Sequence, residues 1–189
     1  MAGEWASTRS ALKTPGVGGE KVKFDSRDLA LTAVSASLYA VLVLVLSSIS
    51  FELIQVRVAD ALIPLSMVFG WPIAVGVTVG GAIANVVSPM PSVITDVTLG
   101  SLANFIASTI AWKIGLLKLR SRGLSEFLGC LAATAIVTFI VGTYLAILTE
   151  MELWIWWLGI GVGSIFSINI LGYMLVQVMK RLTRKTNVT

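Results

Sequence analysis

The sequence of 189 residues contains no histidine, which excludes the side chain most often used as a metal ligand, haem ligand or general base. Its one cysteine, Cys130, cannot form a disulfide within the chain. No Gly-x-x-x-x-Gly-Lys-Ser/Thr loop is present, so the chain does not hydrolyse ATP by itself. Asp60 and Asp96 are candidates for a catalytic carboxylate pair, but no supporting motif surrounds either residue. We therefore predict a protein that is not an enzyme and holds no metal and no cofactor.

Charged residues are also scarce, because they make up 13% of the chain while hydrophobic residues make up 56%. This composition does not suit a soluble domain. A helix needs about 20 apolar residues to cross the hydrocarbon core of a membrane. Five runs of that kind contain no charge, and the sequence is therefore typical of a polytopic membrane protein; the runs are residues 29–51, 61–95, 97–112, 127–149 and 153–179.

The second uncharged run is too long for a single crossing, and Gly70-Trp71-Pro72 forms a helix-breaking turn signal inside it. Division at this turn predicts an all-α membrane protein with a bundle of six transmembrane helices. The second helix, residues 60–69, contains Pro64 and would span only about 15 Å. Its backbone must therefore face protein or a water-filled cavity, since lipid cannot satisfy irregular backbone groups.

The basic residues indicate the orientation. Thirteen of the fourteen Lys and Arg residues precede the first helix, lie between the fourth and fifth helices, or follow the sixth, and Arg57 is the exception. The positive-inside rule then places both termini in the cytoplasm of a multi-pass plasma-membrane protein. We expect residues 1–27 to be a disordered cytoplasmic tail, residues 28–180 to be the transmembrane domain, and residues 181–189 to be a basic cytoplasmic tail.

Small residues mark two helix faces. In the first helix, Ala33 and Ser37 are four residues apart, as are Ala36 and Ala40, and this spacing allows close approach of another helix. The pattern predicts either packing within the bundle or a docking face for a partner protein. The third helix, with Gly76 and Gly80 at the same spacing, is expected in the middle of the bundle.

Polar side chains gather in the outer half of the predicted bundle, which indicates a ligand pocket open to the outside. Several have a second interpretation: Asp96 as a helix N-cap, Arg57 as a partner of Asp60, and the tryptophans as an interfacial belt. Asn169 is predicted to form a hydrogen bond between helices. The candidate substrate-binding residues are Glu52, Gln55, Arg57, Asp60, Asn85, Ser88, Asp96, Asn104, Glu150, Trp154 and Trp157.

Three stretches carry a family resemblance, and they are residues 55–62 (QVRVADAL), Ala84-Asn85 with Ser88-Pro89, and residues 96–103 (DVTLGSLA). With six short helices and a small-residue first helix, the chain resembles the substrate-binding (S) components of energy-coupling factor (ECF) transporters. Within that group it is most similar to the QueT-type family, which is associated with queuosine precursors. Ala59-Asp60 stands where we expect Ser-Glu, which keeps the carboxylate on a shorter stem and leaves the ligand open.

The resemblance implies a substrate-capture subunit that binds a deazaguanine, such as queuine or preQ1, from the outside. It also implies a transmembrane coupling subunit and two ABC ATPase subunits as partners, with Ala33, Ala36, Ser37 and Ala40 as the docking face. Two alternatives stay open at this point. One is an S component for another micronutrient, such as thiamine, riboflavin or tryptophan, and the other is a membrane scaffold protein without a ligand.

Overall fold

The computed structural model describes residues 25–52, 55–117 and 123–186, and these residues form helices and short connections without any strand. The all-α class is therefore confirmed for this part of the chain. The elements in order are α1 (Ser26–Val45), α2 (Ser47–Ser50), the 3-10 helix η1 (Val58–Leu65), α3 (Ser66–Phe69), α4 (Trp71–Asn85), α5 (Val93–Gly115), α6 (Leu124–Thr149), α7 (Leu153–Ser164), the π-helical η2 (Ile165–Gly172) and α8 (Tyr173–Thr186).

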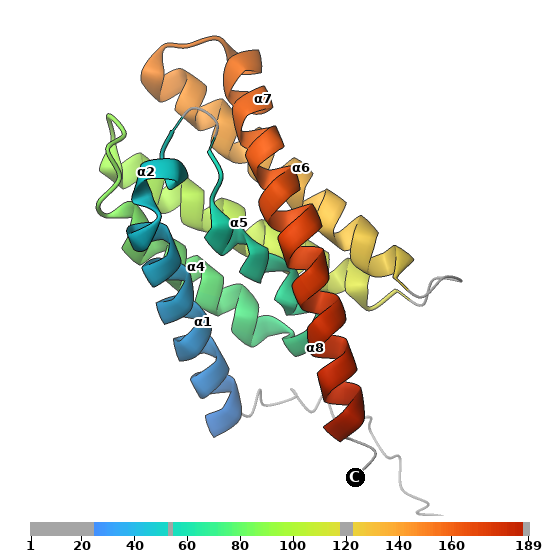
Figure 1. Ribbon diagram of the computed structural model, residues 1–189. Helices are drawn as coiled ribbons and strands as arrows, with labels where there is room; N and C mark the ends of the chain where they lie inside the picture. Colours follow the sequence, from blue (N-terminus) through green and yellow to red (C-terminus); the bar gives the residue numbers. More distant parts are fainter. Residues whose placement is uncertain (1–24, 53–54, 118–122, 187–189) are drawn as a thin grey trace, which may run out of the picture.

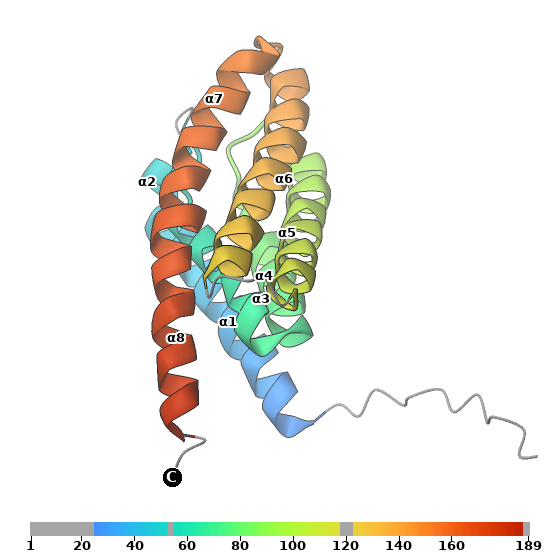
Figure 2. The same ribbon diagram turned by 90° about the vertical axis from the view of Figure 1, so that its right-hand side faces the viewer.

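The helices form a bundle in which the start of α1 and the end of α8 lie at the same end (Figure 1). The α6–α7 turn lies at the opposite end, as Figure 2 also shows. Described basic residues at the first end include Arg27, Lys113 and Arg181, whereas Glu52 and Glu150 flank connections at the other. This sorting agrees with the predicted orientation, which stays a prediction.

The predicted tails lie largely outside the described residues, which begin at residue 25 and end at residue 186. Helix α1 begins at Ser26, and α8 continues through Thr186. The first six residues of the predicted 181–189 tail therefore extend the last helix.

Within the described residues, four helical segments are long and apolar enough to cross a membrane, namely α1, α5, α6 and the continuous helix made of α7, η2 and α8. The segments Val58–Phe69 and Trp71–Asn85 are apolar but shorter. The six predicted segments are thus all helical, but the count of six membrane crossings stays a prediction.

The short segment of η1 and α3 lies inside the bundle, as the sequence predicts. Pro64 lacks a backbone N–H, and Gly70 ends the segment at φ 74°, a conformation that favours glycine. The side chains from Ala59 to Pro64 are all buried. Protein therefore surrounds this irregular backbone, which brings Asp60 to the centre of the fold.

Helices α1 and α4 pack closely through small residues. A Cβ atom added at Gly80 would lie 2.5 Å from the Ala36 carbonyl oxygen and 2.8 Å from the Tyr39 Cβ. Ala36 and Ala40 are buried in this contact, whereas Ala33 and Ser37 are exposed. Helix α4 also packs on α5 and so lies between α1 and α5, but Val79 and Ile83 keep one of its faces exposed, and its predicted place in the middle of the bundle stays a prediction. The small-residue face of α1 therefore divides into an inner pair, used for bundle packing, and an outer pair.

Helix α5 begins earlier than the sequence predicts. The Ser92 Oγ caps it by accepting a hydrogen bond from the Thr95 N–H at 3.3 Å. Asp96 is therefore not the N-cap residue, and its carboxylate is available for contacts inside the bundle. This result removes the capping interpretation of Asp96.

The last helix contains a π-helical segment between α7 and α8, where it approaches the rest of the bundle. Asn169 donates to the Thr134 Oγ1 at 2.9 Å, which confirms the predicted hydrogen bond between helices. A Cβ atom at Gly163 would lie 2.0 Å from the Gln55 carbonyl oxygen. Glycine at this position therefore lets the segment that carries Gln55 and Arg57 lie directly on α7.

Candidate functional site

Two buried tyrosine–aspartate pairs form the polar centre of the bundle. The Tyr39 hydroxyl of α1 donates to the Asp60 Oδ1 of η1 at 2.5 Å. The Tyr144 hydroxyl of α6 donates to the Asp96 Oδ1 of α5, also at 2.5 Å. Asn104 donates to the Tyr39 oxygen at 2.9 Å, which ties α5 to the first pair. These hydrogen bonds hold both aspartate side chains in place.

Arg57 adds a buried guanidinium to this centre, with 5% of its surface exposed. It lies within electrostatic range of both Asp60 and Asp96. Among the described residues the ion pair within 4.0 Å is Lys180–Glu126, so the predicted direct pairing of Arg57 with Asp60 is wrong. The guanidinium carbon instead lies 5.5 Å from the centroid of the Phe51 ring, a cation–π contact.

Several buried polar atoms at this centre have no hydrogen-bond partner: the Gln55 Oε1, the Arg57 Nε, the Asn85 Oδ1 and the Asp96 Oδ2. The second amide atom of Asn85, its Nδ2, donates to the Asp96 carbonyl oxygen at 2.9 Å. A buried polar atom without a partner costs about 1–3 kcal/mol. Such a group of unpartnered atoms is therefore unfavourable for folding alone, and it is typical of a site that binds a polar ligand.

A small cavity lies at this centre and has one polar and one aliphatic wall. Its volume is about 10 Å³, which is room for about one water molecule. The lining residues are Gln55, Arg57, Asp60, Asn104 and Ser164 on the polar side, and Val137, Val141 and Ile160 on the apolar side. The described residues thus close around the polar centre, in contrast to the open pocket that the sequence predicts.

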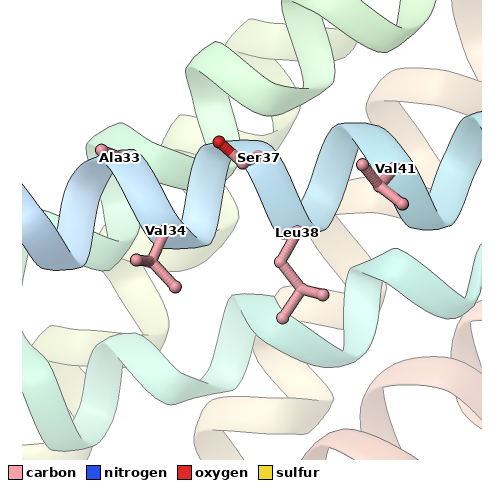
Figure 3. Close-up of a pocket in the computed structure, with 5 residues that line it drawn as sticks. All are labelled: Ala33, Val34, Ser37, Leu38 and Val41. Carbon is pink, nitrogen blue, oxygen red and sulfur yellow. The ribbon is translucent and has the colours of Figure 1, made fainter.

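The outer side of α1 carries a shallow apolar groove of about 420 Å³, formed by Ala33, Val34, Ser37, Leu38 and Val41 (Figure 3). Ala33 and Ser37 are the two small residues that line this groove, on the side of the helix opposite Val34 and Leu38 (Figure 3). All five residues are exposed, and Val34 and Val41 are more than half exposed, so the described part of the bundle leaves most of this face uncovered. The α1 groove, defined by these five residues, is thus separate from the α1–α4 contact.

A family model described as the QueT transporter matches residues 29–181, which include every helix that forms the polar centre. This chain belongs to the QueT transporter family. No curated protein and no solved structure matches it. The family and the long apolar helices together indicate a membrane transport protein.

The structure brings some of the predicted site residues of this QueT family member together. Gln55, Arg57, Asp60 and Asn104 line the cavity. Asn85 and Asp96 are buried but do not line it; the Asn85 Nδ2 donates to the Asp96 carbonyl oxygen, and Tyr144 donates to the Asp96 carboxylate.

The remaining predicted residues lie elsewhere. Ser88 is buried but accepts a hydrogen bond from the Met90 N–H at 3.3 Å in the connection that follows α4. Glu52 and Glu150 are exposed. Trp154 is 60% exposed, and Trp157 packs edge-on against Phe139 with ring centroids 5.1 Å apart. None of these five residues lines the cavity, so the predicted stacking of a ligand on a tryptophan has no support here.

Sequence reasoning missed Tyr39, Tyr144 and Ser164, which contribute to the polar centre of this QueT family member. Each lies in a long apolar run, and a single polar residue in a transmembrane helix usually faces the bundle interior. That signal was present for Tyr39, because the tyrosine lies one helical turn from Ala36 on the packed face of α1. The apolar wall of Val137, Val141 and Ile160 has no sequence signal that separates it from ordinary core.

Proposed function

We propose that this chain is the substrate-capture subunit of an ECF-type importer and that it binds a queuosine precursor of the deazaguanine class at the polar centre. The observation that carries the proposal is the set of buried, unpartnered polar atoms around Arg57 and Asp60, inside a member of the QueT transporter family. Buried polar groups in a membrane protein are costly, and they are kept where a substrate pairs with them.

The chemistry of the site suits the edge of a guanine-like base. Adjacent N–H donors on such a base match the two oxygens of a carboxylate, here Asp60. The carbonyl oxygen of the base accepts from Arg57, whose Nε has no partner among the described residues. Val137 and Val141 supply an aliphatic surface for the flat ring. Each recognition element therefore comes from a residue at the cavity wall.

Binding requires the site to open, because a cavity of about 10 Å³ does not hold a bicyclic base. The segment of Gln55, Val56 and Arg57 is the element placed to move, since it lies against α7 at Gly163 and precedes a short 3-10 helix. We propose that the base enters when this segment moves away from α7 and that its return encloses the ligand.

The first prediction concerns the ligand. Purified chain titrated with queuine or preQ1 should show a rise in unfolding temperature and a saturable binding signal, since ligand bound only to the native state stabilises it. Asp60→Asn should weaken binding about tenfold or more, because the ligand loses a charge-assisted hydrogen bond. Glu150→Gln removes an equal charge at an exposed position and should bind as the unmodified chain does.

Stabilisation by thiamine, riboflavin or tryptophan instead would assign the chain to another micronutrient. A chain that none of these compounds stabilises would fit the membrane scaffold and contradict the proposed function.

The second prediction concerns the partner. We propose that the α1 groove receives a transmembrane coupling subunit, which in turn contacts two ABC ATPase subunits. Ser37→Leu fills the groove and should prevent co-purification with those subunits while leaving ligand affinity unchanged, because Ser37 faces away from the polar centre. Leu128→Ala changes an exposed apolar residue on α6 and serves as the matched control. Intact assembly in Ser37→Leu would move the docking face elsewhere.

A further inference from the structure

Three buried side chains from three different elements form a chain of hydrogen bonds that ends at Asp60. Asn104 of α5 donates from its Nδ2 to the Tyr39 hydroxyl oxygen at 2.9 Å, and the Tyr39 hydroxyl donates to the Asp60 Oδ1 at 2.5 Å. All three side chains are at least nine-tenths buried, and Asn104 and Asp60 also line the cavity. Asn104 could therefore serve a ligand in two ways, by direct contact or through Tyr39 and Asp60.

A backbone carbonyl of α4 fixes the orientation of the Asn104 amide. The Nδ2 also donates to the Val77 carbonyl oxygen at 3.3 Å. A carbonyl oxygen only accepts hydrogen bonds, so the amide nitrogen, and not the amide oxygen, must face it. The two N–H groups of the amide are both used by these contacts, to Tyr39 and to Val77. Asn104 therefore has no N–H left to donate to a ligand.

The direction of the next hydrogen bond follows from this orientation. An amide nitrogen does not accept, so the Tyr39 oxygen accepts from Asn104, and the single hydroxyl proton of Tyr39 is directed at Asp60. The direction is the same for an ionised and for a protonated Asp60, because a proton on this carboxyl group would have to lie on Oδ2. Tyr39 therefore occupies Oδ1, and Oδ2 is the oxygen left for a ligand.

Gly81 of α4 provides the space for the Asn104 amide. A Cβ atom added at Gly81 would lie 2.6 Å from the Asn104 Nδ2, whereas the Tyr39 Cε1 would lie at 3.6 Å, an ordinary contact. A methyl group at this position would thus displace the amide nitrogen and leave the tyrosine ring in place. The close approach of α4 and α5 at Gly81 is therefore part of the same arrangement.

We infer that Asn104 is a positioning residue, which holds the Tyr39 hydroxyl and, through it, the Asp60 carboxyl group in the orientation that receives the ligand. The inference rests on the proposed function and gives Asn104 a different role from the direct ligand contact that the sequence predicts. A binding group needs supporting side chains that are themselves locked by hydrogen bonds and packing. Val77, Asn104 and Tyr39 provide that support for Asp60.

A double-mutant cycle on ligand affinity tests the inference, with queuine and preQ1 titrated separately. Tyr39→Phe and Asn104→Leu should each weaken binding about tenfold, the size of one lost hydrogen bond at the site. The double variant should bind as Tyr39→Phe does, within about twofold, because Asn104 acts through the hydroxyl that phenylalanine lacks.

Asn169→Leu is the matched control, since it also removes a hydrogen bond from an amide to a hydroxyl at 2.9 Å, between η2 and α6. This variant should lose thermal stability and keep the affinity of the unmodified chain, which separates positioning from a general loss of structure. Gly81→Ala provides a second route if Asn104→Leu does not fold. It should weaken binding on its own and have no further effect when combined with Tyr39→Phe.

Losses that add in the double variant would mean that Asn104 contacts the ligand directly, which overturns the positioning role and leaves the proposed function intact. Unchanged affinity in Asn104→Leu or in Gly81→Ala also overturns the positioning role. Failure of both queuine and preQ1 to bind the unmodified chain overturns the proposed function and this inference with it.

Discussion

Gly163→Ala is expected to weaken ligand binding about tenfold or more and to lower the thermal stability of the chain. The new methyl group would lie 2.0 Å from the Gln55 carbonyl oxygen and 2.6 Å from its carbonyl carbon. Both are backbone atoms, so the segment that carries Gln55 and Arg57 must move by about 1.4 Å to restore an ordinary contact of 3.4 Å. Binding sites tolerate displacements of only about 0.5 Å, and Arg57 would leave its productive position.

Gly161→Ala is the matched control for this change, because Gly161 lies two residues before Gly163 on the same helix. A Cβ atom there meets only the Thr138 side chain at 3.5 Å, an ordinary contact. Alanine is a better helix former than glycine by about 0.8–1.0 kcal/mol, so this variant should be as stable as the unmodified chain or more so. Isothermal titration and thermal unfolding of both variants check the prediction, and equal affinities would show that the Gln55 segment does not position the ligand.

Gly80→Ala is expected to destabilise the chain by about 1–3 kcal/mol, the usual cost of overpacking. The added methyl group would lie 2.5 Å from the Ala36 carbonyl oxygen, and only a separation of α1 from α4 relieves this overlap. The same separation would shift Tyr39, whose Cβ lies 2.8 Å from the added atom, and would disturb its hydrogen bond to Asp60. Ligand affinity should therefore fall along with stability.

Helix propensity alone predicts the opposite sign for Gly80→Ala, which makes the measurement decisive. The control is Val79→Ala, at the exposed position of α4 that precedes Gly80. This change should alter the free energy of unfolding by no more than about 0.5 kcal/mol. Thermal unfolding in detergent compares the two variants. A Gly80→Ala variant more stable than the unmodified chain would mean that α1 and α4 are not held in the close contact described above.

The helical architecture could be predicted because uncharged runs and turn signals are strong patterns in a membrane protein. The break at Gly70-Trp71-Pro72 separates α3 from α4, and the short segment around Pro64 is buried as expected. The boundaries were less accurate, since α5 begins at Val93 through its Ser92 cap rather than at Asp96. A hydroxyl cap leaves a weaker sequence signal than a carboxylate placed within an apolar run.

The candidate site was predicted only in its charged and amide members, such as Arg57, Asp60 and Asn104. Their partners Tyr39 and Tyr144 were not, because the pairing depends on which helix faces which, and one sequence does not contain that information. The exposed acids and tryptophans were grouped with the site because they are near the same membrane boundary in the sequence. Proximity along the membrane normal does not bring side chains into one cavity.

Leu38 and Tyr39 are neighbours in the chain, yet they serve opposite sides of α1. Leu38 faces the outer groove, whereas the hydroxyl of Tyr39 holds the carboxylate of Asp60. A rigid helix transmits any small rotation or shift undiminished from one side to the other. A displacement of α1 as a whole would therefore move Tyr39 and change the Tyr39–Asp60 geometry directly, so the outer groove and the buried carboxylate are coupled through one helix.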